Sequence, residues 1–189
     1  MTLLETERLV GEPASEAAHR EIAVELFGDP RVAEWIWPGD RGGARTPAQS
    51  EEILARFARG WIDQGIGWWY LRERDRGGYV GEVGLQRATV RGTPTVEIGW
   101  TLLPHHWGRG YATEAARAAL SFGFDQVGLP EIVAFTLPHN VASRRVMERL
   151  GMSFDGDVAH AGLPHVVYRL SEPTFAGMAA APSAETRRP

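Results

Sequence analysis

Two glycines and an arginine precede a stretch that the sequence predicts to be helical, and this spacing could bind a phosphate. The stretch reads Trp107-Gly108-Arg109-Gly110-Tyr111-Ala112, and the helix is expected to open at Thr113. The N-terminus of a helix presents unpaired backbone N–H groups and the positive end of its dipole, both of which favour an anion. Glycine lets the backbone approach such a ligand without a Cβ in the way. We therefore predict an anion cradle here, to which Arg109 adds a positive charge.

The spacing of the glycines separates three kinds of loop that bind phosphate in this way. A dinucleotide fingerprint needs a third glycine near position 113, where this chain has Thr113. A P-loop needs the triplet Gly-Lys-Ser/Thr, which the sequence lacks. The pyrophosphate loop of the GNAT superfamily of N-acetyltransferases reads Arg/Gln-x-x-Gly-x-Gly/Ala, and Trp107-x-x-Gly110-x-Ala112 resembles it except at the first position. For the loop taken alone, an ordinary helix start that contains glycine is the alternative.

Motifs on both sides of the loop extend this resemblance over residues 5–170. The chain resembles the GNAT branch typified by RimJ/RimL-type ribosomal-protein N-terminal acetyltransferases. Two positions depart from the pattern: Trp107 replaces Arg or Gln, which removes one cation, and His105 stands where relatives often carry an acidic residue. The matching segments are Glu5-Thr6-Glu7-Arg8-Leu9, residues 97–104, residues 107–115, Asn140-x-x-Ser143-x-Arg145-Val146 with Leu150-Gly151-Met152, and Val167-Tyr168-x-Leu170.

The resemblance implies a binding site for acetyl-CoA as the acyl donor. It would lie in a wedge between the strand predicted at 95–102 and the short strand predicted at 132–136. Backbone groups of the first strand would pair with the pantetheine arm, the loop would hold the pyrophosphate, and Asn140 would bind the pantetheine. Capping of the next helix is an equally open role for Asn140. The residues expected at the cofactor are Trp100, Thr101, Leu102, Trp107, Gly108, Arg109, Gly110, Tyr111, Ala112, Thr113, Asn140 and Arg145.

Glu97 has the side chain that best suits a general base. N-acyl transfer needs a neutral amine, and an α-amine has a pKa of about 7.7–8 whereas that of lysine is about 10.4. A carboxylate on a strand covered by helices would be partly desolvated, which raises its pKa toward this task. The alternative is a structural Glu97 that pairs with an arginine.

The resemblance also implies how the leaving group and the oxyanion would be stabilised. Many superfamily members carry a tyrosine where this chain has Met147, and Ser143 would then assist the leaving thiolate. The alternative for Ser143 is an ordinary polar residue in the first turn of a helix. A backbone N–H of residues 97–102, at a bulge that family members have, would meet the oxyanion.

Five tryptophans crowd the first half of the chain, which forms the acceptor side in the family that the chain resembles. We interpret most of them as core residues, because Trp61 fits the apolar stripe of its predicted helix. Trp35 and Trp37 are the candidates for contact with an acceptor substrate, because they lie in residues 31–45, where no regular pattern is evident.

The helices and strands that must position these residues are predicted from the periodicity of apolar residues and from the turn and capping residues between them. Helices are predicted at 16–27, 47–64, 113–127 and 140–150. Strands are predicted at 6–10, 68–72, 79–88, 95–102, 132–136, 154–159 and 165–170. This order indicates an α+β chain in which a strand meander leads into a strand–helix–strand–helix unit. The resemblance implies the GNAT fold: a mixed, mostly antiparallel central sheet of about six to seven strands, flanked by about four helices and splayed at the cofactor wedge.

Length, charge and composition limit the classes of function. The 189 residues predict one domain over 1–170 and a flexible tail over 171–189. The net charge of −4 gives no electrostatic reason to expect nucleic acid. The chain has no cysteine, and no stretch approaches the roughly 20 apolar residues of a membrane span, so we expect a cytoplasmic protein without disulfides. No metal is expected, because His105 and His106 have no third ligand at a recognisable spacing.

The leading interpretation is an acetyltransferase that moves an acetyl group from acetyl-CoA to a primary amine. The acceptor would be a peptide N-terminus or a small molecule, two options that the sequence does not separate. Two alternatives remain: a catalytically silent acyl-CoA-binding module, and a transferase that uses a larger donor such as succinyl-CoA. We expect a monomer or a homodimer, with neither nucleic acid nor membrane as partner.

Overall fold

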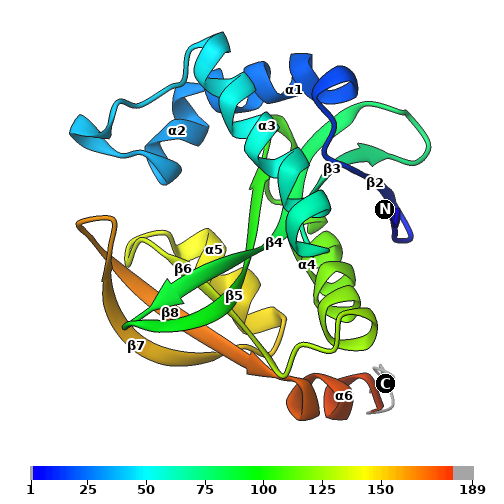
Figure 1. The fold of residues 1–189 in the computed structure, drawn as a ribbon, viewed down its shortest axis with the longest axis vertical. Coiled ribbons are helices and arrows are strands. Elements are labelled where there is room, and N and C mark those ends of the chain that lie inside the picture. The colour runs from blue at the N-terminus through cyan, green and yellow to red at the C-terminus, as the bar shows by residue number, and fades with distance from the viewer. Residues whose placement is uncertain (1, 181–189) are drawn as a thin grey trace, which may run out of the picture.

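A computed structural model describes residues 2–180 of the chain, and within them one eight-stranded sheet forms the centre of the molecule (Figure 1). The strand order is β1-β2-β3-β4-β5-β6-β8-β7. Neighbouring strands are antiparallel except β5 and β6, which are parallel. The strands are β1 Leu4–Glu5, β2 Leu9–Pro13, β3 Trp68–Glu73, β4 Tyr79–Val90, β5 Thr93–Leu102, β6 Glu131–Thr136, β7 Ser153–His160 and β8 Leu163–Ser171.

Helices cover both faces of this sheet (Figure 1). The first three pack on one face, where they contact Trp68 and Tyr70 of β3. The fourth and fifth pack on the other face, against β5 and β6. No helix within residues 2–180 combines the length and the apolar character needed to cross a membrane. The α-helices are α1 Glu16–Gly28, α2 Pro30–Ile36, α3 Pro47–Gln64, α4 Tyr111–Ser121, α5 Val141–Arg149 and α6 Glu172–Ala180. Gly39–Arg41 and Pro104–His106 are short 3-10 helices, and Phe122–Gln126 is a π-helical continuation of α4.

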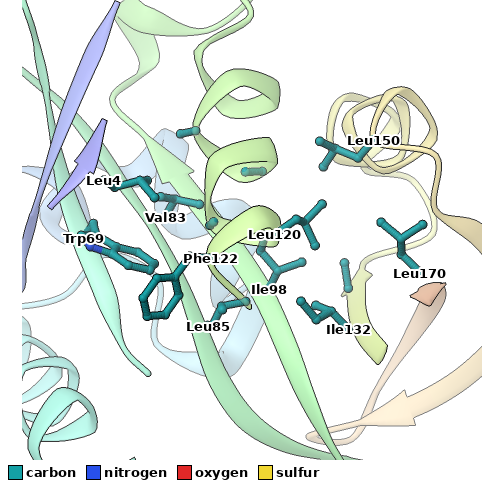
Figure 2. Packing of buried hydrophobic residues seen from close by; sticks show 14 of the residues in the cluster. Leu4, Trp69, Val83, Leu85, Ile98, Leu120, Phe122, Ile132, Leu150 and Leu170 are labelled. Carbon is teal, nitrogen blue, oxygen red and sulfur yellow. The ribbon is translucent and has the colours of Figure 1, made fainter. Parts of the chain in front are cut away.

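The largest apolar cluster lies between α4 and the sheet (Figure 2). Leu120 of α4 packs there with Ile98 of β5 and Ile132 of β6. The helix also turns fully buried alanines, Ala115 and Ala119, toward the strands, and such small side chains let the helix axis come close. This layer holds β5 and β6 from one side and so sets their relative position.

β5 and β6 are paired at one pair of residues, and the two strands diverge from each other beyond it. β4 and β5 pair continuously from Gly81↔Leu102 to Val90↔Thr93, whereas β5 and β6 pair only at Glu97↔Val133. Backbone groups of β5 away from this pair therefore lack a strand partner on that side, and a bound ligand can supply one. The splayed sheet implied by the family resemblance is thus present, with Glu97 at the point of divergence.

The structure corrects the number of elements. The described residues form eight strands and six α-helices, where the resemblance implies about six to seven strands and four helices. The strand predicted at 6–10 is replaced by the hairpin of β1 and β2. α2 falls in the segment without an evident pattern. It forms because Asp29 accepts a hydrogen bond from the Arg31 N–H at 2.8 Å, and Pro30 suits the first helical position.

The segment predicted to be a flexible tail, 171–189, begins with ordered structure. Ser171 ends β8, and Glu172–Ala180 forms α6. Phe175 of α6 is buried, with its ring centroid 5.1 Å from that of Phe124. The remainder of that segment, 181–189, lies outside the described residues. A composition rich in alanine and proline therefore concealed a short helix that packs against the core through Phe175.

Candidate functional site

Glu97 lies on β5 between Gln86 of β4 and Val133 of β6. It shares its face of the strand with Gly99, which contacts Trp68 of the layer beneath α1 and α3. Its Oε2 accepts a hydrogen bond from Gln86 Nε2 at 2.9 Å. The side chain is partly buried, and in the part of the chain that the structure describes it forms no ion pair with an arginine. The structural Glu–Arg pair is therefore not found here.

The surroundings of Glu97 make its carboxyl group a weaker acid than usual. Burial raises its pKa to about 7, and the hydrogen bond from Gln86 opposes this rise. A carboxyl group of that pKa exchanges a proton near neutral pH, as a general base must. Gln86 is a residue that the sequence analysis missed. The available signal was a polar side chain directly after the buried run of β4, on the same strand face as Glu82.

The glycine loop has the geometry of an anion cradle. α4 begins at Tyr111, slightly before the predicted start. Gly108 and Gly110 have φ angles of +75° and +82°, in the left-handed region that glycine adopts without strain. Among the residues that the structure describes, no side chain caps α4, so its first backbone N–H groups can bind an anion. Within the described residues, the buried Thr113 Oγ1 also has no hydrogen-bond partner. These features fit a pyrophosphate group.

Side chains of the loop anchor it to the sheet. The Tyr111 hydroxyl donates a hydrogen bond to Glu73 Oε1 of β3 at 2.6 Å, and Arg109 Nη1 lies 4.0 Å from the same oxygen. Trp107 Nε1 donates to the Leu102 carbonyl oxygen at 2.7 Å. Trp107 thus ties the loop to the end of β5, at the position where the family pattern has a cation. Its hydrogen bond competes with the pantetheine pairing predicted for Leu102.

The remaining predicted residues of β5 border the wedge. Trp100 packs against the apolar cluster around α4, and Thr101 lies across from Glu82 of β4. The bulge implied for this strand is not found in the described residues, because β5 pairs with β4 without a register shift. A shift does occur between β3 and β4, at Leu71 and Arg72. The oxyanion contact inferred from a bulge in residues 97–102 therefore lacks support from the backbone.

The first turn of α5 carries three predicted residues. Asn140 is buried, and its Oδ1 accepts a hydrogen bond from the Ser143 N–H at 3.1 Å, so Asn140 caps the helix. Ser143 is partly buried, and Arg145 is exposed. Because α5 follows β6 directly, this turn lies at the end of one of the two diverging strands. The capping role of Asn140 is thus present, and a role toward the pantetheine is still a prediction.

The two tryptophans predicted at the acceptor side have different surroundings. Trp37 packs against Phe27, with ring centroids 5.8 Å apart, and belongs to the layer beneath α1 and α3. Trp35 faces the start of α5, where its ring centroid lies 5.7 Å from that of His139, the neighbour of Asn140. Trp35 is therefore the better placed of the two for a ligand in the wedge. The tryptophans buried in the core, as predicted, are Trp61, Trp68 and Trp69.

The adjacent histidines lie beside the glycine loop. Their ring centroids are 4.2 Å apart; His106 is buried and His105 is exposed. Burial lowers the pKa of His106. Among residues 2–180, no group of three or more histidine, aspartate or glutamate side chains is arranged to hold a metal ion.

Comparisons with known proteins agree with this architecture. The family model described as "Acetyltransferase (GNAT) domain" matches residues 8–153. The protein YkkB of Bacillus subtilis is 31% identical over 143 residues, which are 76% of this chain and 80% of that protein. The crystal structure of a GNAT-family acetyltransferase from Bacillus anthracis has a TM-score of 0.75 at 26% identity, covering 91% of this chain and 99% of that one. RimL, a ribosomal α-N-protein acetyltransferase in complex with coenzyme A, has a TM-score of 0.75 at 14% identity, covering 90% and 98%, a likeness of fold alone.

Proposed function

The chain belongs to the GNAT family of acetyltransferases, and we propose that it transfers the acetyl group of acetyl-CoA to a primary amine. The observation that carries this proposal is Glu97, a desolvated carboxyl group at the single pair where β5 and β6 meet. The uncapped α4, which follows β5 after the glycine loop, suits the pyrophosphate of the donor. A donor held there and along β5 would bring its acyl end toward Glu97.

In this reaction Glu97 is the general base. It accepts a proton from the amine, whose nitrogen attacks the carbonyl carbon of the thioester. The tetrahedral intermediate then collapses: the C–S bond breaks, the amide stays on the acceptor, and the thiolate leaves. The Ser143 hydroxyl donates a hydrogen bond to the leaving sulfur. The thiolate then takes up a proton from solvent, and Glu97 releases to solvent the proton that it accepted, so the enzyme returns to its starting state. Support for Ser143 is its place in the first turn of α5, directly after the diverging β6.

We assign the binding of acetyl-CoA to the backbone of β5, the glycine loop and the first turns of α4 and α5. Thr113 supports this assignment most directly, because its buried hydroxyl lacks a partner in the described part of the chain and can donate to a phosphate oxygen. Asn140 and Arg145 would contact the donor from α5. Arg109, whose side chain is half-exposed, would add positive charge beside the pyrophosphate.

The acidity of Glu97 favours an acceptor amine of low basicity. A base with a pKa of about 7 is closely matched to an α-amine, with a pKa of about 7.7–8.0, and poorly matched to lysine, at about 10.4. We therefore propose an α-amine, on a peptide N-terminus or a small molecule, as the acceptor. This fits the RimJ/RimL-type branch that the motifs resemble. The cytoplasmic location expected from the sequence belongs to the same proposal.

A thiol-release assay tests the function. The protein is incubated with acetyl-CoA and a panel of N-terminal peptides, free amino acids and lysine-type amines. We expect coenzyme A release with at least one α-amine. Glu97→Gln keeps the size of the side chain but cannot take a proton, so its kcat should fall by about a hundredfold while acetyl-CoA affinity is unchanged. Glu52→Gln, at an exposed position of α3, is the matched control and should keep both.

Other outcomes of this assay identify other functions. Binding of acetyl-CoA without release for any amine would indicate the silent acyl-CoA-binding module. Faster release from succinyl-CoA would indicate the larger donor. Wild-type kcat in Glu97→Gln at every pH would exclude Glu97 as the base, and absence of binding to any CoA ester would remove the proposal.

A further inference from the structure

The side chain of Gln86 is held between two others on the sheet face that carries Glu97. Its Nε2 donates a hydrogen bond to Glu97 Oε2 at 2.9 Å, and its Oε1 accepts a long one from Trp68 Nε1 at 3.4 Å. An indole nitrogen can only donate, and an amide has one donor end and one acceptor end. Trp68 therefore determines which way the amide of Gln86 points, with its N–H groups toward Glu97.

The position of the Trp68 indole is determined by the space above two glycines and by a stacking contact with α3. Its indole lies across β4 and β5, where Gly84 and Gly99 leave room. A Cβ at Gly84 would lie 2.5 Å from Trp68 Cγ, and one at Gly99 would lie 2.7 Å from Cη2. Phe57 of α3 stacks on the indole, with ring centroids 4.4 Å apart and planes at 12°. Since a side chain at either glycine would displace the ring, its position is built into β4, β5 and α3 together.

We propose that Gln86 is a positioning residue for Glu97. The amide, oriented by Trp68, holds one carboxylate oxygen and leaves the other to accept the proton of the acceptor amine. This inference rests on the proposed function, in which Glu97 is the general base. An amide turned the other way would place its oxygen against the carboxylate, and a missing amide would leave Oε2 without a donor. Either change disfavours the ionised form that must accept the proton.

Few other groups bear on the ionisation of Glu97. β6 presents the apolar Val133 across from it, and α3 covers this face with Phe57 over Trp68. The next titratable side chain on the same face of β4 is Glu82, beyond Gly84. Two influences act on the pKa of Glu97: burial raises it and the hydrogen bond from Gln86 lowers it. Removal of that hydrogen bond should therefore change the pKa of Glu97 measured in a titration.

The test is the pH dependence of kcat/KM in Gln86→Met, a side chain of similar length without N–H groups. We expect the acid limb to move upward by about one pH unit. The rate at pH 7 then falls about fivefold, and the difference closes above about pH 9, where both forms are ionised. Carbon NMR titration of protein labelled at its glutamate carboxyls should give the same shift without turnover, with Glu97→Gln identifying the signal.

Trp68→Phe tests the orienting step. It keeps a ring for Phe57 to stack on but removes the indole N–H, so Gln86 can turn, and the acid limb should move the same way by less. Trp69→Phe is the matched control. Trp69 is also buried, its Nε1 donates to the Thr2 carbonyl at 2.8 Å, and it faces the other side of the sheet. This control should lower the thermal midpoint without moving the limb.

The outcomes separate this inference from the function on which it rests. An unshifted titration in Gln86→Met, while Glu97→Gln stays slow, overturns the positioning role and leaves Glu97 as the base. Wild-type turnover in Glu97→Gln overturns the proposed function instead. If Gln86→Met fails to fold, Trp68→Phe carries the test, and an unshifted limb in that variant counts against the inference.

Discussion

Glu82 and Glu97 share a residue type and a sheet face but differ in what they can reach. Burial raises the pKa of both, to about 8 for Glu82 and about 7 for Glu97. Glu82 is 1% exposed and lies across from Tyr70 in the layer beneath α1 and α3. Glu97 lies where two strands part, and its side chain keeps some exposure. Access to a substrate, and not acidity alone, therefore makes Glu97 the candidate base.

A substitution at Ser143 can distinguish its structural role, in which the backbone N–H takes part in the cap of α5, from a catalytic role of its hydroxyl. The cap of α5 uses its backbone N–H, which Ser143→Ala retains, so the thermal midpoint should stay unchanged. The variant loses the hydroxyl, and kcat should fall roughly 10- to 100-fold, the worth of a hydrogen bond to a charged group. Asn140→Ala is the comparison, because loss of the cap should cost about 1 kcal/mol of stability. Unaltered turnover in Ser143→Ala would remove the hydroxyl from the mechanism.

At the scale of elements, β5, the glycine loop and α4 act as one unit. Trp107 ties the loop to Leu102 at the end of β5, and Tyr111 ties the start of α4 to Glu73 of β3. The loop therefore needs no ligand to hold its shape. A preformed cradle loses less entropy on binding than one that must first be ordered.

Gly110→Ala tests this unit. The φ of +82° is strained for alanine, so stability should fall by about 1–2 kcal/mol. The new Cβ would lie 3.4 Å from Arg8 Nη2 at the residue that precedes α4. If the first turn of α4 binds the pyrophosphate, we expect acetyl-CoA affinity to fall about tenfold. Gly77→Ala is the matched control. Gly77 has a φ of +69° with nothing within 4 Å of its Cβ position, in the turn between β3 and β4. Calorimetry should show similar stability losses in both variants and weaker binding only in Gly110→Ala.

At the scale of the whole molecule, the sheet separates two layers of different character. The cluster between α4 and the sheet is apolar, whereas the layer beneath α1 and α3 includes the buried titratable side chains of His19 and Glu82. The wedge opens between β5 and β6. The protonation of Glu82 in the layer beneath α1 and α3 therefore affects the stability of the folded protein, and the protonation of Glu97 affects the candidate site.

Stability should consequently depend on pH through Glu82. Its pKa is raised in the folded state to about 8, so its contribution is complete below the unfolded value and is lost as pH rises toward 8. The slope is at most about 1.4 kcal/mol per pH unit. Glu82→Gln should lose less stability than the wild type between pH 5.5 and 8.5 in urea unfolding. Glu52→Gln, which makes the same charge change at an exposed position, should follow the wild type. Parallel curves for wild type and Glu82→Gln would contradict the assignment.

The kind and the place of an element were predictable wherever local signals are strong. α3 begins at Pro47 as predicted, because Thr46 and Gln49 form a capping box. The central strands and the helix after the glycine loop follow from alternation and turn residues. α2 and α6 escaped prediction because no periodic pattern marks them: α2 depends on the Asp29 cap, and Phe175 of α6 contacts an aromatic ring that is distant in the sequence.

By itself, the sequence determined the glycine loop, the helix that follows it and the strand that carries Glu97, because these depend on residues close together in the chain. Only the tertiary structure decided the surroundings. It placed Gln86 beside Glu97, tied Trp107 to Leu102 and turned Trp35 toward His139. Strand register and helix packing decide such contacts, and both depend on how the whole core closes. The glycine loop seen first in the sequence thus has the geometry of an anion cradle, and the fold decided the burial of Glu97, the candidate base.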